Sequence, residues 1–228
     1  MLVIVPSRGR PANITALIES WKQTRTYASL LVVIDHDDDT LANYYTAVAN
    51  APDWVTLTVT ERKRLGPTLN EYALNNVQGY DIIGFMGDDH RPRTHGWDQR
   101  FAASIATVGG IGIAYGNDLI QGVNLPTAVW MSSCIIETIG YMVPPGMIHL
   151  YLDDFWKALG LRLQRLTYLN DVVIEHMHPV AGKAEWDDRY AEVNAGSMYE
   201  NDGRLFQDYL AHTLQADAEK IIERCVIR

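Results

Sequence analysis

The stretch Asp81-Ile-Ile-Gly-Phe-Met-Gly-Asp-Asp-His-Arg-Pro92 contains a short apolar run that ends in two adjacent carboxylates. An apolar run of this length between turn residues is typical of a strand buried in a parallel sheet, so we expect a strand over 82–86. Ligands of open α/β sheets bind beyond the carboxyl ends of the strands, which is where Asp88 and Asp89 would lie. Two such carboxylates repel each other unless a cation or hydrogen bonds stabilise them. The stretch therefore predicts a site for a hard cation shared with a phosphate, although a turn before a capped helix would also explain the pair.

The residues before this stretch predict a strand followed by a helix, three times in succession. Apolar strands are expected at 2–5, 30–34 and 54–59, and Pro11 suits the first turn of the first helix. This alternation is typical of the nucleotide-binding half of an α/β protein with right-handed crossovers. No strand is followed by Gly-x-Gly-x-x-Gly or by Gly-x-x-x-x-Gly-Lys-Ser/Thr. Ordinary dinucleotide-binding and P-loop folds are therefore disfavoured.

The second half of the chain has a less regular pattern, and we expect it to hold shorter elements. Neither a repeat nor a linker divides the sequence. We therefore predict one domain over 1–228, made of a nucleotide-binding half (1–90), an acceptor half (91–180) and a helical C-terminal segment (181–228). The elements expected in order are a helix over 97–105, strands over 109–116 and 129–136, a helix from Asp153 or Asp154, strands over 163–166 and 172–174, and helices from 185 onward.

Composition and charge exclude several classes of protein. Of the 228 residues, 47% are hydrophobic and 21% are charged, which is typical of a globular domain with a sizeable core. The net charge of -9 disfavours a nonspecific nucleic-acid binder. No apolar run approaches about 18 residues and no basic leader precedes one, so we expect no membrane span. Cys134 and Cys225 lie far apart and predict a reducing, cytoplasmic compartment rather than a disulfide framework.

Charged residues after the first three predicted strands are candidates for nucleotide binding. Asp35 ends a predicted strand, where its carboxylate could accept hydrogen bonds from a ribose or a base. Asp38 and Asp39 follow it, and capping of the next helix explains them equally well. Arg8 and Arg64 lie in loops at the same edge of the sheet. Guanidinium groups bind phosphate oxygens in pairs, and the alternative for both arginines is a solvated loop.

Polar residues elsewhere are candidates for catalysis and metal binding. A carboxylate at a helix start could remove a proton from an acceptor hydroxyl, so Asp153 and Asp154 are candidate bases, with helix capping as the alternative. His176 and His178 stand two apart on an extended segment and so face the same side, as metal ligands or a polar edge would. Asn70 could bind a base or a diphosphate, or lie on a helix surface.

Several motifs occur in the order that is found in one family of enzymes. The chain resembles the GT-A-fold nucleotide-sugar glycosyltransferases over roughly residues 1–180, especially the large inverting family that includes many small bacterial and phage enzymes. The motifs that carry the resemblance are Val5-Pro-Ser-Arg-Gly-Arg-Pro11, Ile34-Asp35, Gly66-Pro-Thr-Leu-Asn70-Glu71, Phe85-Met-Gly-Asp88-Asp89-His-Arg-Pro92, Leu152-Asp153-Asp154 and His176-Met-His178.

The resemblance implies a GT-A-like, mostly parallel sheet flanked by helices, with a small antiparallel addition. It implies transfer of a sugar from a nucleoside-diphosphate sugar to an acceptor hydroxyl, with inversion and with Mn²⁺ or Mg²⁺. The family's metal motif is Asp-x-Asp, and Gly87 occupies its first position here, so Asp89 is the expected ligand, and Asp88 is expected either nearer the ribose or behind Asp89 without touching the metal. The implied donor contacts are Pro6, Ser7, Arg8, Asp35, Arg64, Asn70 and Asp88; the implied metal ligands are Asp89 with His176 or His178; the implied base is Asp153 or Asp154.

Two other functions are compatible with the same residues. A nucleotidyltransferase also joins an α/β nucleotide fold to acidic ligands, but its sugar-nucleotide-forming members usually carry a glycine-rich loop where this chain has Pro6-Ser-Arg-Gly-Arg-Pro11. A degenerate sugar- or nucleotide-binding module is the other, and Gly87 favours it. The acceptor of a transferase could be a protein, a glycan or, ranked lower because of the acidic charge, modified DNA. Trp130, Trp156 and Trp186 could stack on sugar faces, although most aromatic residues are core.

Overall fold

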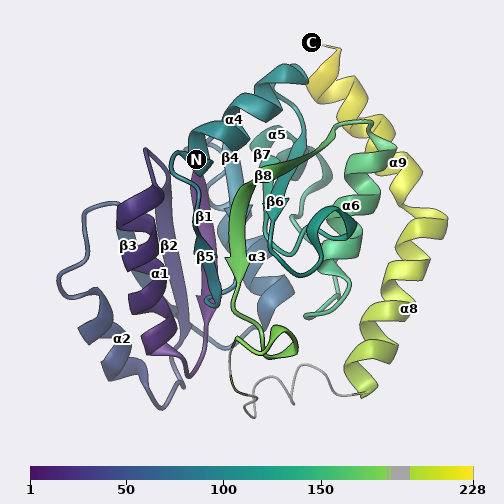
Figure 1. Cartoon of the computed structure of the whole chain (residues 1–228). Helices are drawn as coiled ribbons and strands as arrows, with labels where there is room; N and C mark the ends of the chain where they lie inside the picture. Colours follow the sequence, from purple (N-terminus) through teal and green to yellow (C-terminus); the bar gives the residue numbers. More distant parts are fainter. Residues whose placement is uncertain (184, 186–195, 228) are drawn as a thin grey trace.

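The computed structural model describes residues 1–183, 185 and 196–227, in which helices cover both faces of a sheet (Figure 1). The predicted α/β class is confirmed. The strands are β1 (Leu2–Ser7), β2 (Ser29–Asp35), β3 (Val55–Thr60), β4 (Ile82–Phe85), β5 (His90–Pro92), β6 (Ile113–Asn117), β7 (Val129–Ser132) and β8 (Leu166–His176). The helices are α1 (Pro11–Thr24), α2 (Leu41–Val48), α3 (Leu65–Leu74), α4 (Trp97–Thr107), α5 (Ser133–Ile139), α6 (Leu152–Arg162), α8 (Gly196–His212) and α9 (Leu214–Ile221), with the shorter turns η1 (Gly122–Asn124), η2 (Pro179–Ala181) and η3 (Ile222–Val226).

The order of the strands creates a crevice at one edge of the sheet. Among the described residues this order is β3-β2-β1-β4-β7-β6-β8-β5. Strands β1 to β4 are parallel, and the chain moves outward from β1 through β2 to β3 before β4 pairs with the other side of β1. Such a reversal is a topological switch point, and ligands bind beyond the carboxyl ends of the strands that flank it. Strands β7 and β5 add antiparallel pairings, so the whole sheet is mixed.

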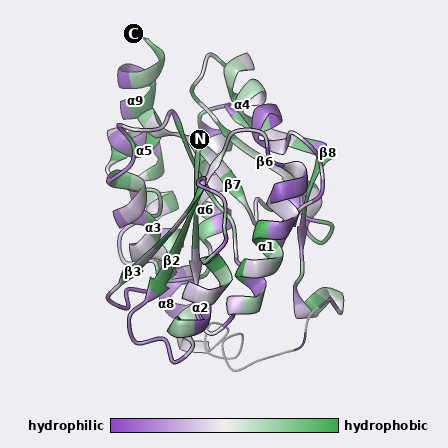
Figure 2. Ribbon diagram, turned by 90° about the vertical axis from the view of Figure 1, so that its left-hand side faces the viewer, coloured by the Kyte–Doolittle hydropathy of each residue, from purple (hydrophilic) through white to green (hydrophobic). Residues whose placement is uncertain are grey.

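Apolar side chains alternate along the strands and divide the core into two layers. On β1, Leu2 and Ile4 face the layer of α3, α5, α6, α8 and α9, whereas Val3 and Val5 face α1, α2 and α4. Figure 2 shows the apolar strands in green, enclosed by helices that carry polar residues in purple. None of the described helices is both long enough and apolar enough to cross a membrane.

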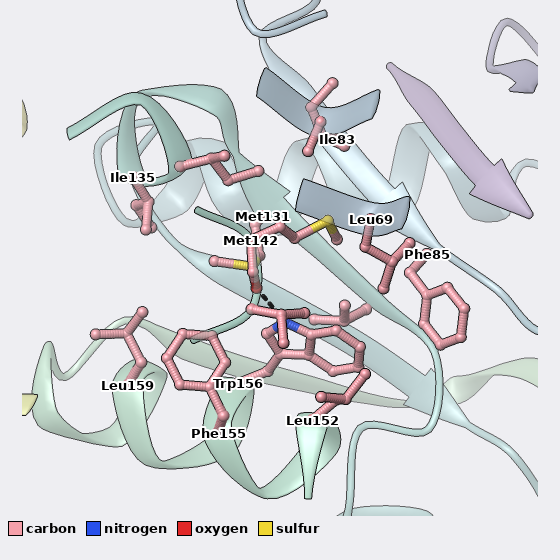
Figure 3. Close-up of a cluster of buried hydrophobic side chains, with 14 of the residues drawn as sticks. Leu69, Ile83, Phe85, Met131, Ile135, Met142, Leu152, Phe155, Trp156 and Leu159 are labelled. Carbon is pink, nitrogen blue, oxygen red and sulfur yellow. Dashed lines mark hydrogen bonds between the residues drawn. The ribbon is translucent and has the colours of Figure 1, made fainter. Parts of the chain in front are cut away.

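The tryptophans considered for sugar stacking belong to the core. Trp156 packs against Phe85 and donates a hydrogen bond from Nε1 to the carbonyl of Met142 at 2.9 Å (Figure 3). Trp156 and Trp130 are 1% and 0% exposed, which agrees with the core role that was the alternative to sugar stacking, and Trp156 also borders the cavity described below. Trp186 lies outside the described residues.

Two predicted elements differ from the observed ones. The predicted strand over 129–136 ends at Ser132, because α5 begins there and buries the consecutive pair Ile135 and Ile136, which a strand would point to opposite faces. The strand predicted over 172–174 is part of β8. The strand predicted over 163–166 is wrong except for Leu166, because Leu163 caps the C-terminus of α6 and Gln164 turns the chain with a φ of 56°. The polar residues in the middle of β8 remain part of the strand because its register with β6 shifts there: Gly116 pairs with Leu169, and the next residue, Asn117, pairs with Val173. This irregularity accommodates the residues between Leu169 and Val173.

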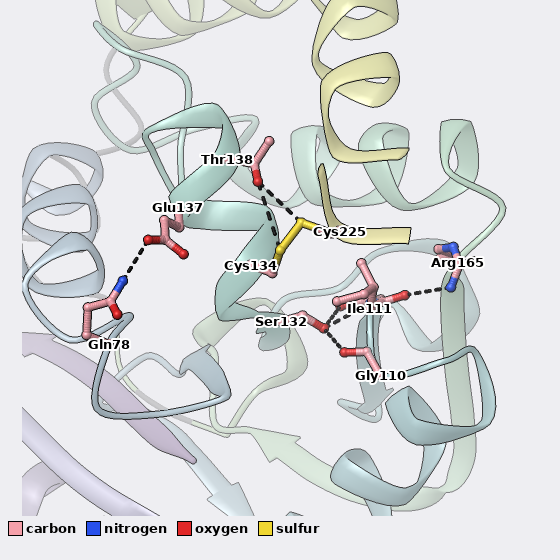
Figure 4. Close-up of a disulfide and its surroundings, with 10 residues drawn as sticks. Gln78, Gly110, Ile111, Ser132, Cys134, Glu137, Thr138, Arg165 and Cys225 are labelled. Carbon is pink, nitrogen blue, oxygen red and sulfur yellow. Dashed lines mark hydrogen bonds between the residues drawn. A yellow bond between two sulfur atoms is a disulfide. The ribbon is translucent and has the colours of Figure 1, made fainter. Parts of the chain in front are cut away.

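Cys134 and Cys225 form a disulfide bond between α5 and η3, with Cα atoms 6.1 Å apart (Figure 4). The prediction that these cysteines are unpaired is therefore wrong. Their sequence separation of 91 concealed that α9 and η3 return to pack against α5. The inference of a reducing compartment, which rested on unpaired cysteines, loses its support.

Candidate active site

A cavity of about 390 Å³ lies at the carboxyl ends of β1, β2 and β4, where the switch point predicts one. The start of α3 and the segment 149–153 close it from the opposite side. The cavity gathers most of the residues proposed from the sequence, although these come from distant parts of the chain. The predicted residues that line it are Pro6, Ser7, Arg8, Asp35, Arg64, Asp88, Asp89, Asp153, His176 and His178.

Asp88 is held rigidly across the switch point. Its Oδ2 accepts a hydrogen bond from the Ser7 hydroxyl at 2.5 Å, and its Oδ1 accepts one from Asn13 Nδ2 at 3.2 Å. Arg10 lies 3.8 Å from the same Oδ1. Burial and the neighbouring charge of Asp89 raise the pKa of Asp88 to about 6. Both carboxylate oxygens are thus engaged by the protein, and Asp88 ties the end of β1 to the turn after β4.

Asp89 faces the cavity and meets a histidine from the other end of the domain. Its Oδ2 lies 3.3 Å from Nε2 of His176, the last residue of β8. Burial opposes ionisation of Asp89, but the imidazole of His176 outweighs it, and the pKa of Asp89 lies well below its usual range. The pairing of β5 with β8 sets this geometry, because it places His90 directly opposite His176.

His90 is a residue of the site that sequence reasoning did not assign. Its ring stacks on that of His176 with centroids 4.2 Å apart, and Asp89, His90 and His176 form a group whose ligand atoms lie within 4.8 Å of one another. The amide of Gly87 donates to Nδ1 of His90 at 3.0 Å, so that nitrogen carries no proton even though Asp89 Oδ1 lies 3.4 Å away. The proton then lies on Nε2, 3.5 Å from the Thr127 hydroxyl. The position of His90 directly after the acids was the available signal.

His178 also lines the cavity, beside His176. Its ring centroid is 5.0 Å from that of His176, and its Nδ1 accepts a hydrogen bond from the amide of Val180 at 3.2 Å. It does not belong to the group of Asp89, His90 and His176 among the described residues. His176 is therefore the better placed of the two predicted histidines.

The opposite end of the cavity is rich in arginine. Arg8 donates to Asp35 at 3.0 Å and to Asp37 at 2.5 Å, and Arg62 lies 3.9 Å from the same Asp35 carboxylate. Arg64 precedes α3 with a φ of 71°, a left-handed conformation that is uncommon outside glycine and often marks a functional site. These cations surround the carboxylate that was predicted to contact the nucleoside.

Asp38 has a structural role, but not the helix capping that was offered as its alternative, because Thr40 precedes α2 and the start of that helix has no side-chain cap. The side chain is buried and accepts hydrogen bonds from the Thr40 amide at 2.7 Å and from the Gly9 amide at 2.7 Å. It therefore fixes the turn after β2 against the loop after β1. Asp39 does not line the cavity within the described part of the chain.

The two candidate bases at the start of α6 are not equivalent. Asp153 lines the cavity, whereas Asp154 does not line it in the described chain. Burial and the adjacent charge of Asp154 raise the pKa of Asp153 to about 6. The residue before the helix, Tyr151, has a φ of 59°, so this wall, like the start of α3 at Arg64, holds a non-glycine residue in the left-handed region.

Asn70 lies outside the cavity as far as the chain is described, which argues against a donor contact. Its Oδ1 accepts from the amides of Met142 and Val143 at 2.8 Å each, and its Nδ2 donates to the carbonyl of Val143 at 2.8 Å. Both polar atoms of the side chain are thereby engaged by backbone. It holds α3 to the segment after α5, a role that neither sequence interpretation contained.

Comparison with known proteins gives matches in structure but not in sequence. No family model matches the chain, and no curated protein matches its sequence. Solved structures match it over nearly its whole length. The fold is GT-A-like.

Three nucleotide-sugar glycosyltransferases illustrate the match. The mannosyltransferase PcManGT from Pyrobaculum calidifontis, solved with GDP-Man and Mn²⁺, aligns with a TM-score of 0.57 and 13% identity over 97% of this chain and 73% of its own. S. aureus TarS 1-349 with UDP-GlcNAc aligns at 0.57 and 15% identity over 97% and 70%. Mycobacterium tuberculosis glucosyl-3-phosphoglycerate synthase with Mg²⁺ and UDP aligns at 0.57 and 14% identity over 91% and 78%. The resemblance noted from the motifs is thus confirmed for the fold.

Proposed function

We propose that this protein is a metal-dependent glycosyltransferase that moves a sugar from a nucleoside-diphosphate sugar to an acceptor hydroxyl with inversion. The observation that carries the proposal is the meeting of Asp89 and His176 in the cavity that Asp153 also lines. A carboxylate and an imidazole positioned for a cation, beside a carboxylate whose pKa is raised to about 6, are the groups that such a transfer requires. The GT-A-like fold supports the same class of reaction.

The residues fit a hard divalent cation. Asp89 offers an oxygen and His176 a nitrogen, and both atoms come from the wall of the cavity. Mn²⁺ accepts such a mixed set, and Mg²⁺ accepts the carboxylate together with substrate phosphates. Bound there, the ion would neutralise the negative charge of a departing nucleoside diphosphate. His178 is a candidate for a further contact.

The chain's own groups perform the remaining work. Asp153 takes the proton from the acceptor hydroxyl as its oxygen attacks the anomeric carbon. A single carboxylate base acting on the acceptor gives one displacement and therefore inversion. Arg10 and Arg64 line the cavity and stabilise the phosphate oxygens, while Pro6 and Asp35 contact the nucleoside. Asp88, fixed by Ser7, holds the turn that presents Asp89.

The donor side is tested by calorimetric titration of UDP and GDP with and without Mn²⁺. We expect one of them to bind, and to bind at least about tenfold more tightly with the metal. A screen of nucleotide sugars should then show release of nucleoside diphosphate. If neither nucleotide binds with any divalent metal, the proposal fails. Release of pyrophosphate would instead indicate that the protein is a nucleotidyltransferase. Nucleotide binding without any turnover would indicate a degenerate sugar- or nucleotide-binding module.

A further inference from the structure

The C-terminal helix α8 reaches the cavity through one buried carboxylate. Asp202 is 0% exposed and accepts hydrogen bonds from three successive backbone amides, those of Ile148 at 3.0 Å, His149 at 2.7 Å and Leu150 at 2.8 Å. Hydrogen bonds from several amides to one ionised carboxylate fix a loop strongly, because each is charge-assisted. The segment fixed in this way runs directly into the cavity wall 149–153.

The same face of α8 also supports the residue that precedes α6. The Tyr151 ring stacks on Phe206 with centroids 5.8 Å apart and meets Tyr199 edge-on at 6.5 Å. A methyl group at Gly203 would come within 3.2 Å of the Tyr151 ring, so glycine permits this approach. The four residues of α8 that face the wall are Tyr199, Asp202, Gly203 and Phe206, a helical spacing that puts them on one side.

The start of this segment is also held by α3. The amide of Gly66 donates to the carbonyl of Ile148 at 2.9 Å, and a Cβ at Gly66 would lie 2.2 Å from the carbonyl oxygen of Met147. The wall is thus clamped between α3, which follows Arg64, and α8. Tyr151 keeps its left-handed backbone between these two supports, and Asp153 follows it by two residues.

From these contacts we infer that Asp202 is a positioning residue, which holds the 148–153 wall so that Asp153 and His149 face the reacting groups. This inference rests on the proposed function for its catalytic part. It makes α8 a support of the acceptor side of the site, although α8 lies beyond residues 1–180, whose motifs carry the resemblance in sequence. Figure 1 shows α8 at the outer edge of the molecule, so the helix supports the site from outside.

The test compares Asp202→Asn with Asp217→Asn in the full chain. Asp217 is a matched control, because it is also buried in the C-terminal helices and accepts a hydrogen bond from Tyr141, but it lies outside the cavity lining in the described chain. In Asp202→Asn we expect amide exchange at 148–150 to rise at least about tenfold and kcat for transfer or donor hydrolysis to fall by a similar factor. Nucleotide Kd should stay within about threefold, because the donor side is built on β1, β2 and β4. Asp217→Asn should lose thermal stability without either change.

The outcomes separate this inference from the proposed function. The inference about Asp202 is overturned if amide exchange at 148–150 in Asp202→Asn equals that of the wild type, or if exchange rises while kcat does not change. An equal loss of kcat in Asp217→Asn would overturn it too. If wild-type protein binds no nucleotide, the proposed function fails, and the exchange comparison still decides whether Asp202 holds the wall. Should Asp202→Asn not fold, Gly203→Ala presses on the Tyr151 ring from the same helix. It should lower kcat more than nucleotide affinity, and unchanged kcat would contradict the positioning role.

Discussion

The two walls of the cavity are built in different ways: the proposed donor wall is formed by the ends of β1, β2 and β4, and the proposed acceptor wall by the segment 149–153. On the donor wall, functional side chains follow directly from strand ends: Ser7 ends β1, Asp35 ends β2, and Asp89 follows β4. On the acceptor wall, the candidate base Asp153 stands in the first turn of α6, and a carboxylate from α8 some fifty residues later fixes the backbone of the loop that leads into this helix. A wall made of strand ends inherits its geometry from the sheet, whereas a loop wall needs supports from elsewhere. Changes to the acceptor wall should therefore alter turnover, and changes to the donor wall should alter binding.

The largest expected effect on turnover belongs to Asp153. Asp153→Asn keeps the shape but removes the base, and we expect kcat to fall about 10²- to 10⁴-fold with nucleotide Kd within about threefold. Single-turnover kinetics and calorimetry measure the two quantities. Asp154→Asn is the matched control, since its carboxyl does not line the cavity in the described chain. Its kcat should stay within about threefold, and a larger loss at Asp154 would reassign the base.

The donor wall is tested by a pair of histidine variants. We expect His176→Ala to weaken Mn²⁺ binding about 100-fold, because its Nε2 lies 3.3 Å from Asp89 Oδ2. His178→Ala should weaken Mn²⁺ binding by less than the roughly 10- to 100-fold cost of removing a residue that orients a ligand, because His178 does not belong to the group of Asp89, His90 and His176 among the described residues. Mn²⁺ titration in the presence of the bound nucleoside diphosphate gives both values. Equal losses would show that both imidazoles coordinate the ion.

The donor wall and the overall topology could be predicted from the sequence to a large extent, because periodicity and strand-end polarity are local signals. Ser7, Asp89 and Asp153 lie together as the motif order implied. The roles of His90 and Asn70 could not be predicted, because each depends on pairing with backbone far away in the chain. Asn70, for example, binds the backbone of Met142 and Val143. The disulfide and the Asp202 contacts could not be predicted for the same reason, because they depend on how the C-terminal helices pack against α5 and against the segment 148–150.

The pH dependence of turnover should also report the acceptor wall. Burial and the charge of Asp154 raise the pKa of Asp153 to about 6. A base acts when it is ionised, so kcat should be constant above about pH 6 and fall about tenfold for each unit below it. Because the pKa of Asp88 is also raised to about 6, the profile of Asp88→Asn is the control. If the fall in kcat below about pH 6 persists in Asp88→Asn, it is due to Asp153. If the fall disappears in that variant, it is due to Asp88 on the donor wall.

Stability should respond to the same group with the opposite sign. The folded state binds the Asp153 proton more tightly than the unfolded chain, in which an aspartate has a pKa of about 3.9. The group therefore stabilises the fold most below about pH 4, and this contribution is lost as pH rises through about 6. At about pH 7.5 the Asp153→Asn variant should accordingly melt a few degrees above the wild type. An unchanged or lower Tm would show that the ionised carboxylate costs the fold nothing.

The smallest effect on turnover is expected from the disulfide, because it joins two residues outside the cavity lining in the described chain. It closes a loop with a sequence separation of 91, so Cys134→Ser with Cys225→Ser should reduce the free energy of unfolding by about 2–4 kcal/mol. Denaturant unfolding measures that loss. Turnover well below the Tm should stay within about twofold, because Asp202 and Phe206 hold α8 to the wall independently of η3. A larger kcat loss with fast exchange at 148–150 would mean that the covalent link, rather than Asp202 alone, sets the acceptor wall.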